Sequence, residues 1–180
     1  MNKTKDLVLC GMFAALMAVI SQLSIPMPSG VPITLQIFGV ALIGSVLGWR
    51  LGAMSLTVYL LIGAVGLPVF ANFGGGLSRL VGVTGGYLWS YPFMAAFCGI
   101  RPQTGKQRLD LILSLLSALC GLAVCELIGG LQWAALSGGA MTLKGVFTYA
   151  LAAFIPKDTV LTVVAVLLSG SVRNMLQGHS

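Results

Sequence analysis

The pattern of apolar and polar positions along the chain predicts six membrane-spanning helices. Apolar runs that are nearly free of charged residues alternate with short stretches rich in glycine, proline or basic residues. A helix crosses a bilayer with about 20 residues, and each run approaches that length, the second with the help of its flanking loop. The predicted spans are Asp6–Leu23, Thr34–Gly48, Leu51–Gly66, Gly85–Ile100, Leu109–Trp133 and Gly145–Gly170.

The composition agrees with a membrane protein. The chain has 180 residues, of which 57% are hydrophobic and 8% are charged, whereas a soluble domain carries about 25% charged residues. We therefore predict an all-α integral membrane protein in which residues 1–180 form a single transmembrane domain. The N-terminal apolar run is longer than that of a secretory signal peptide, and no small-residue cleavage site follows it. We expect it to be retained as the first span.

The basic residues predict which connections face the cytoplasm. With a cytoplasmic N-terminus, seven basic residues lie inside, two lie outside, and Lys157 falls within the sixth span. This excess on one side follows the positive-inside rule and predicts that both termini are cytoplasmic. It also accounts for the net charge of +6 without a nucleic-acid partner. The inside residues are Lys3, Lys5, Arg50, Arg101, Lys106, Arg108 and Arg173, and the outside residues are Arg79 and Lys144.

The outward-facing stretch 74–89 reads GGGLSRLVGVTGGYLW and is a candidate binding segment. Glycine lets the backbone approach a ligand closely, and exposed amides in such a loop can bind an anion or a polar ring. A re-entrant loop followed by an aromatic belt explains the same residues equally well. The candidates are the cation Arg79, the helix-cap candidate Thr84, the helix-starting Gly85 and Gly86, and the rings of Tyr87 and Trp89.

Ionisable residues within the predicted spans are the second candidate site. Glu126, Lys157 and Asp158 lie at membrane depth, where an ionisable group usually faces the interior of the helix bundle. Lys157 and Asp158 are neighbours and point about 100° apart on a helix, so they are not an ideal ion pair. Pro156 before them can kink the helix. The pair is either a ligand site or a structural ion pair, and Glu126 is as easily a buried pairing residue as a site residue.

No catalytic or metal-binding pattern is present in the sequence. The four cysteines lie in or beside apolar runs without a CxxC spacing, and the single histidine, His179, is near the C-terminus. The chain has neither a phosphate-binding loop nor a dinucleotide-binding fingerprint. We therefore expect a protein that is not an enzyme and that needs no cofactor or metal. If it transports actively, another chain hydrolyses the ATP.

Small residues along the first predicted span suggest close helix packing. Gly11 and Ala15 form one small-xxx-small pair, and Ala14 and Ala18 form another. Such pairs let helices approach closely in lipid. They serve either internal packing or docking onto another membrane subunit.

Three segments together resemble the BioY family, the biotin-specific substrate-binding (S) components of energy-coupling-factor transporters. These segments are PITLQ (32–36), LLIGAVGLPVFA (60–71) and GGGLSRLVGVTGGYL (74–88). The resemblance implies a six-helix protein of the plasma membrane that captures biotin from outside, with closure of the loops at 24–34 and 68–83. It also implies a transmembrane coupling subunit and two ATPase subunits as partners, although some members act without them. Ala14 and Ala18 match the alanine motif that docks the coupling subunit.

The resemblance also implies which residues would contact each part of biotin. Asn72 and Asp158 would contact the ureido ring of biotin, Tyr87 and Trp89 would form apolar walls, and Lys157 or Arg79 would meet the carboxylate. The chain departs from the family pattern at two places. Val83 replaces a proline before TGGY, and in FIPKDTVL Lys157 occupies a glycine position while Leu161 stands where a lysine is frequent.

Four alternatives stay open from the sequence. The protein could bind another vitamin, such as thiamin or riboflavin, or it could transport biotin without ATPase partners. A membrane-embedded enzyme would need an activated nucleophile or a metal, and neither is evident. A purely structural membrane subunit would tolerate the loss of Lys157 and Asp158.

Overall fold

The structure is a computed structural model that describes residues 3–27, 31–137 and 143–177. Two short strands form an antiparallel hairpin between the first two helices, and a single 3₁₀ turn, η1, follows the third. The elements are α1 (Lys3–Ser21), β1 (Ser24–Ile25), β2 (Ile33–Thr34), α2 (Gln36–Leu47), α3 (Trp49–Ala64), η1 (Ala71–Phe73), α4 (Leu77–Val81), α5 (Gly85–Cys98), α6 (Gln107–Leu136), α7 (Leu143–Ala153) and α8 (Ile155–Gln177).

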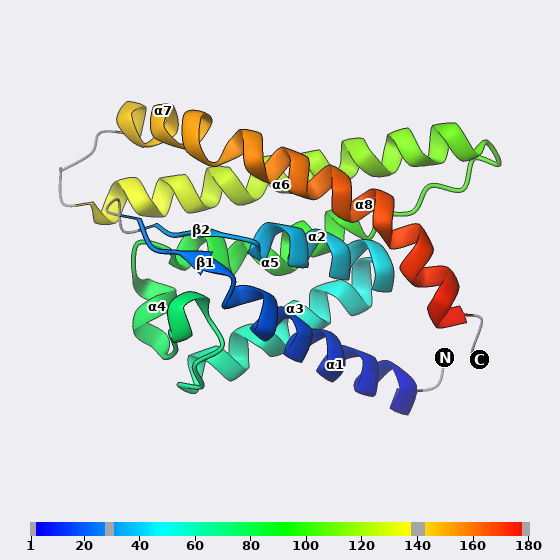
Figure 1. The fold of residues 1–180 in the computed structure, drawn as a ribbon, viewed down its shortest axis with the longest axis horizontal. Helices are drawn as coiled ribbons and strands as arrows, with labels where there is room; N and C mark the ends of the chain where they lie inside the picture. Colours follow the sequence, from blue (N-terminus) through cyan, green and yellow to red (C-terminus); the bar gives the residue numbers. More distant parts are fainter. Residues whose placement is uncertain (1–2, 28–30, 138–142, 178–180) are drawn as a thin grey trace.

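The helices run between two ends of an elongated bundle (Figure 1). The start of α1, the α2–α3 junction, the α5–α6 connection and the end of α8 lie at one end. The β1–β2 hairpin, α4 and α7 lie at the other. Helices α1, α2, α3, α5, α6 and α8 alternate in direction between these ends. The segments that carry most of the basic residues therefore gather at one end of the molecule.

The predicted spans differ from the observed helices in length and continuity. Among the described residues, three helices are long and apolar enough to cross a membrane, at residues 3–21, 107–136 and 155–175. The second and third predicted spans correspond to the shorter helices α2 and α3. The sixth is not one helix, because α7 ends at Ala153 and α8 begins at Ile155. Pro156 at the second position of α8 accounts for this break, since proline fits the first turn of a helix but would remove a backbone hydrogen bond from the interior of one continuous helix.

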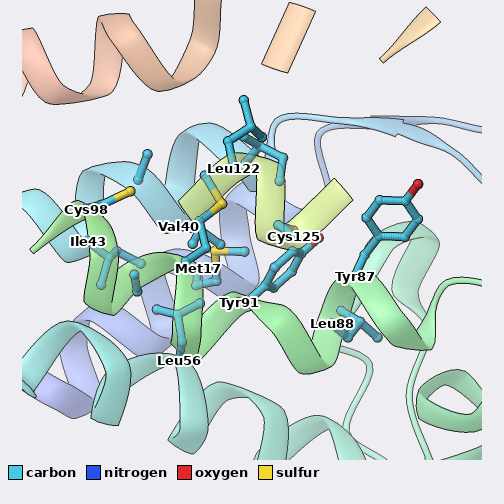
Figure 2. Close-up of a cluster of buried hydrophobic side chains, with 14 of the residues drawn as sticks. Met17, Val40, Ile43, Leu56, Tyr87, Leu88, Tyr91, Cys98, Leu122 and Cys125 are labelled. Atoms are coloured by element: carbon cyan, nitrogen blue, oxygen red, sulfur yellow. The ribbon is translucent and has the colours of Figure 1, made fainter. Parts of the chain in front are cut away.

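The core lies between α1, α2, α3, α5, α6 and α8, while the outer faces are also apolar. Met17, Val40 and Leu56 are almost inaccessible and pack together with residues of α5 and α6 (Figure 2). On the outside, Leu7 and Leu61 are 71% and 61% exposed, and large hydrophobic side chains are exposed on every long helix. Soluble monomers rarely expose apolar surface this extensively. The outer faces suit contact with lipid, as expected of a multi-pass membrane protein.

The loops at the hairpin end are tied to the end of α1. Gln22 donates from Nε2 to the carbonyl oxygen of Phe70 at 3.2 Å and accepts the backbone N–H of Phe73 at 2.9 Å. Ser24 of β1 donates to Oδ1 of Asn72 at 2.9 Å. These bonds fix the segment around η1 beside the hairpin, where both border the cavity described next.

Candidate functional site

A cavity opens among the hairpin, the start of α2, η1, α4, α5, α6 and the start of α8, and its empty space, counted together with the part open to solvent, is about 640 Å³. Its wall combines aromatic and aliphatic side chains with a few ionisable and amide groups. The lining residues are Val31, Pro32, Thr34, Gln36, Ile37, Phe70, Ala71, Arg79, Thr84, Tyr87, Leu88, Tyr91, Glu126, Phe154, Lys157 and Asp158.

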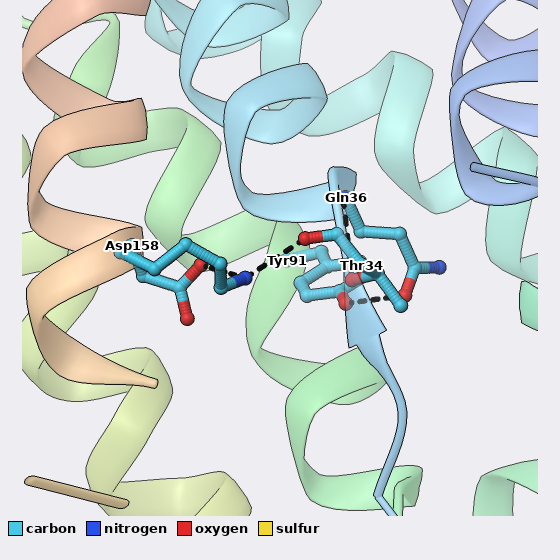
Figure 3. Close-up of polar contacts among 5 residues, drawn as sticks. Thr34, Gln36, Tyr91 and Asp158 are labelled. Carbon is cyan, nitrogen blue, oxygen red and sulfur yellow. Dashed lines mark hydrogen bonds and ion pairs between the residues drawn. The ribbon is translucent and has the colours of Figure 1, made fainter. Parts of the chain in front are cut away.

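Gln36, the first residue of α2, organises a polar network on one wall. Its Nε2 donates to the hydroxyl oxygens of Ser21 and Tyr59, each at 3.2 Å. Its Oε1 accepts the hydroxyl proton of Tyr91 at 3.2 Å (Figure 3). The backbone N–H of Gln36 donates to Oγ1 of Thr34 at 3.3 Å. The amide is therefore held in one orientation by partners on α1, α3 and α5.

Lys157 and Asp158 enter the cavity from the first turn of α8. Lys157 Nζ lies 2.6 Å from Oδ1 of Asp158 and donates to the carbonyl oxygen of Thr34 at 2.8 Å (Figure 3). The two residues form an ion pair although they are neighbours in sequence, because the long lysine side chain folds back toward the carboxylate. The bond to Thr34 joins α8 to the end of the hairpin, so the lysine holds two walls of the cavity together.

Three buried polar atoms of the cavity lack a hydrogen-bond partner in the part of the chain that the structure describes. They are the hydroxyl of Tyr87, Oε2 of Glu126 and Oδ1 of Asp158, the last of which has only its ion pair with Lys157. Glu126 and Asp158 are 7% and 3% exposed. Buried polar groups are nearly always hydrogen-bonded in native proteins. These atoms therefore point to a polar molecule that would complete their bonding.

Arg79 borders the cavity from α4 on the exposed side. Its side chain is exposed, lies beside Gly74 and forms no ion pair with any carboxylate of the described residues. Thr84 also lines the cavity and stands at the residue before α5, but its side chain makes no capping hydrogen bond. The cavity thus has a buried region with two carboxylates and a lysine, and an outer region with an unpaired guanidinium.

A family comparison decides what kind of chain this is. The BioY family model matches residues 1–178. The chain belongs to the BioY family. A probable biotin transporter BioY of Pyrococcus horikoshii is 36% identical over 178 residues, 99% of each chain. The biotin transporter BioY of Thermotoga maritima is 40% identical over 125 residues, which cover 69% of this chain and 72% of that one.

A solved structure has the same fold as this BioY family member. It is the S-component for biotin from an ECF-type ABC transporter, at 27% sequence identity. The two structures agree with a TM-score of 0.80 over 97% of this chain and 94% of the other. The helical bundle is therefore shared across nearly the whole length.

The predicted site residues of this BioY family member fall into two groups. Arg79, Thr84, Tyr87, Lys157 and Asp158 line the cavity. The other four do not, and the structure gives each of them a different contact. They are Asn72, Gly85, Gly86 and Trp89.

The four remaining residues support the elements around the cavity. Asn72 is exposed and bonded to Ser24, and Trp89 donates from its indole N–H to the carbonyl oxygen of Leu80 at 3.1 Å. Gly86 lets α5 approach α6, because a Cβ there would meet the carbonyl oxygen of Ile128. Gly85 likewise packs against the end of α4. Their contacts hold α4, α5 and η1 in place around the cavity.

Four polar residues of the cavity are absent from the predicted site: Thr34, Gln36, Tyr91 and Glu126. Two signals were available. Gln36 is a polar residue at the start of an apolar run, and Tyr91 is four residues after Tyr87, which places both on one helix face. Glu126 is an ionisable residue at membrane depth, but its position on the cavity wall could not be predicted without knowing how α6 packs on α5.

The small-residue pair that α1 exposes on its surface is Gly11 and Ala15, and not Ala14 and Ala18, which match the docking motif of the family. Ala14 is 2% exposed and belongs to the core, and Ala18 is partly buried. Gly11 and Ala15 are exposed, and a Cβ at Gly11 would meet nothing within 4 Å. The open small-residue surface is therefore formed by Gly11 and Ala15 rather than by Ala14.

Among the described residues, no group of three or more His, Cys, Asp or Glu side chains could hold a metal ion.

Proposed function

We propose that this protein is the biotin-binding substrate-capture subunit of an energy-coupling-factor transporter, and not an enzyme. The observation that carries the proposal is a cavity whose wall holds two buried groups without a hydrogen-bond partner among the described residues, Oε2 of Glu126 and the Tyr87 hydroxyl, beside the Lys157–Asp158 ion pair. It occurs in a chain whose full-length relative is named a probable biotin transporter. The fold shared with an S-component for biotin supports the same role.

The cavity has groups that suit each part of biotin. Glu126 and Asp158 can accept the two N–H groups of the ureido ring, and the Tyr87 hydroxyl can donate to its carbonyl oxygen. Phe70, Phe154 and other apolar side chains of the wall can surround the thioether ring and the aliphatic tail. A ligand without the ureido group would leave Oε2 of Glu126 and the Tyr87 hydroxyl without partners, which costs about 1–3 kcal/mol for each group.

We assign the carboxylate of biotin to Arg79 rather than to Lys157. Lys157 is engaged by Asp158 and by the carbonyl oxygen of Thr34, whereas Arg79 is unpaired and exposed on the outer side of the cavity. The ureido ring would then lie deep and the tail would point outward. In this arrangement Lys157 holds Asp158 and the hairpin in position. Thr84 adds a hydroxyl to the wall, while Asn72, Gly85, Gly86 and Trp89 act by positioning η1, α4 and α5.

We propose that residues 1–180 form one transmembrane domain that crosses the plasma membrane six times, with both termini in the cytoplasm. The gathering of basic segments at one end of the bundle supports this orientation (Figure 1). The cavity would then face outward, with closure over it by the loops at 24–34 and 68–83, of which residues 28–30 lie outside the described part of the chain. Cysteines introduced at Ser78 and, separately, at Thr104 test the topology. An impermeant thiol reagent applied to whole cells should label only the first, and labelling only at Thr104 would reverse the topology.

Energy for uptake would come from partner subunits. The sequence has no nucleotide-binding motif, so we propose association with a membrane coupling subunit and two ATPase subunits. Exposed Gly11 and Ala15 on α1 allow close approach of a partner helix. Ala18 would lie at the edge of that contact, and Ala14 would act through internal packing.

Binding of radiolabelled biotin to the purified protein tests the proposal. We expect saturable binding that excess unlabelled biotin displaces and that thiamin and riboflavin leave unchanged. Asp158→Asn should weaken binding at least about tenfold, because a hydrogen bond to a charged group contributes about 1.5–3 kcal/mol. The matched variant Asp6→Asn, at the other end of the bundle, should bind like the wild type. A folded protein without saturable biotin binding would contradict the proposal.

A further inference from the structure

A second cavity lies at the end of the bundle opposite the hairpin, and its empty space, counted together with the part open to solvent, is about 990 Å³. It is a groove between the end of α2, the α5–α6 connection, the first turns of α6 and the last turns of α8. It shares no residue with the biotin cavity. Its charged lining residues are Arg101, Asp110 and Arg173, so two cations face one carboxylate.

The two arginines leave donors available to the groove. Arg101 donates from Nη2 to the carbonyl oxygens of Ser45 and Val46, which caps the end of α2. A guanidinium has five N–H donors, so Arg101 has further N–H groups besides those that bond the carbonyl oxygens of Ser45 and Val46. Burial lowers the pKa of the Arg101 guanidinium, and the nearby charge of Arg173 lowers it further. The two like charges therefore repel each other across the groove, and an anion between them would relieve that repulsion.

The carboxylate in the groove does not neutralise either arginine. Oδ1 of Asp110 accepts the backbone N–H of Thr104 at 2.8 Å and its hydroxyl proton at 2.6 Å. Among the described residues, neither Arg101 nor Arg173 forms an ion pair. The hydroxyl of Ser114, also in the groove, is bonded to a carbonyl oxygen of its own helix. The arginines are thus the groups in the groove that are best placed to receive an added anion.

The rim of the groove is apolar. Ile100, Leu111 and Leu167 line it and are 44%, 41% and 53% exposed. In a multi-pass membrane protein such side chains contact lipid. A ligand that combines an anionic head with apolar chains therefore matches both parts of the groove. Its single negative charge also balances the surplus of one positive charge among Arg101, Asp110 and Arg173.

We propose that this groove binds an anionic phospholipid, with the phosphate between Arg101 and Arg173 and the acyl chains along the apolar rim. Arginine presents paired donors that match the geometry of phosphate oxygens. In the topology proposed above, the groove opens to the cytoplasmic leaflet, where anionic lipids are concentrated. The lipid would hold α2, α6 and α8 together at this end of the bundle and would not contact biotin.

Native mass spectrometry of the detergent-purified full chain tests this proposal. The protein is mixed with equal amounts of phosphatidylglycerol and phosphatidylcholine. We expect phosphatidylglycerol to remain bound roughly tenfold more than phosphatidylcholine, because both lipids carry the phosphate but the two arginines would repel the choline cation of phosphatidylcholine. Arg173→Gln should remove this preference, and Arg173→Lys should keep part of it. Arg108→Gln, which removes a charge from the start of α6 outside the groove, should keep it, and biotin binding should be unchanged in all three variants.

Four results would overturn the proposal. Equal retention of phosphatidylglycerol by the wild type and Arg173→Gln would exclude the groove as its site. An equal loss in Arg108→Gln would indicate diffuse attraction to the basic end. Displacement of the bound lipid by millimolar inorganic phosphate would indicate a site for a soluble phosphate anion. If Arg173→Gln retains the lipid but fails to copurify with the coupling subunit, the groove is a protein-docking surface and the lipid proposal is wrong.

Discussion

Replacing Arg79 by glutamine tests which cation receives the carboxylate of biotin. The side chain of Arg79 is exposed on α4 and borders the outer part of the cavity. Lys157 is held by Asp158 at 2.6 Å and by the carbonyl oxygen of Thr34 at 2.8 Å. Glutamine keeps much of the length and polarity of arginine, so the change mainly removes the charge. We therefore expect a loss of biotin affinity with little change in melting temperature.

The size of the effect follows from the exposure of Arg79. An exposed ion pair contributes about 0.2–1 kcal/mol, whereas a hydrogen bond to a charged group contributes about 1.5–3 kcal/mol when water is excluded. Arg79 borders a cavity that ligand would partly fill, so we expect a contribution of about 1–2 kcal/mol. This corresponds to a roughly 5- to 30-fold rise in Kd.

The assay compares biotin with its primary amide, which lacks the negative charge. Isothermal titration of Arg79→Gln should show the full loss for biotin and almost none for the amide. Lys144→Gln, which removes the other basic residue predicted to face outward, should bind both ligands like the wild type. The assignment is refuted if Arg79→Gln weakens both ligands equally. The assignment is also refuted if Lys157→Gln weakens the binding of biotin but not of its amide, while Arg79→Gln leaves the binding of both ligands unchanged.

Three further predictions concern the buried wall of the cavity. Glu126→Gln should weaken biotin binding roughly tenfold, since the ureido N–H would lose a charged acceptor. The melting temperature of this variant should not fall. An unchanged affinity for biotin would show that Glu126 does not contact the ligand. Gln36→Leu should lower the free energy of unfolding by about 1–3 kcal/mol, because the buried hydroxyl of Tyr91 loses its acceptor. The hydroxyls of Ser21 and Tyr59 keep their bonds to the carbonyl oxygens of Met17 and Val69. A chemical denaturation curve like that of the wild type would contradict this. Lys157→Gln should weaken biotin binding, and the added change Leu161→Lys should restore at least part of it in the same titration; no recovery would show that the position of the lysine matters as well as its charge.

The part of the site that could be predicted from the sequence follows from the energetics of burial. An ionisable group within an apolar span must face the bundle interior, so Lys157 and Asp158 were expected beside a cavity. The structure places both on its wall. A glycine-rich connection that carries a cation was a candidate binding segment, and its Arg79 lines the cavity. These inferences needed only the chemistry of single residues and the order of the helices.

The residues that could not be predicted depend on helix phase and loop conformation. Successive residues of a helix are about 100° apart, so Tyr87 and Trp89 point in nearly opposite directions and only Tyr87 lines the cavity. Tyr91, one turn after Tyr87, shares its face. Asn72 has a φ of 56°, a left-handed conformation that places it beside Ser24. No periodicity in the sequence encodes that placement.

The position of Lys157 shows how the cavity keeps its charge balance despite the departure from the family pattern. Residues 157 and 161 are one turn apart on the same face of α8, so a lysine at either position reaches the same side of the bundle. At 157 it lies in the first turn after the α7–α8 break, within reach of both Asp158 and Thr34. Two carboxylates that are almost fully buried need a nearby cation, because an unpaired buried charge is strongly destabilising. The requirement is therefore for a cation within reach of Asp158, and the register of α8 allows two positions to supply it.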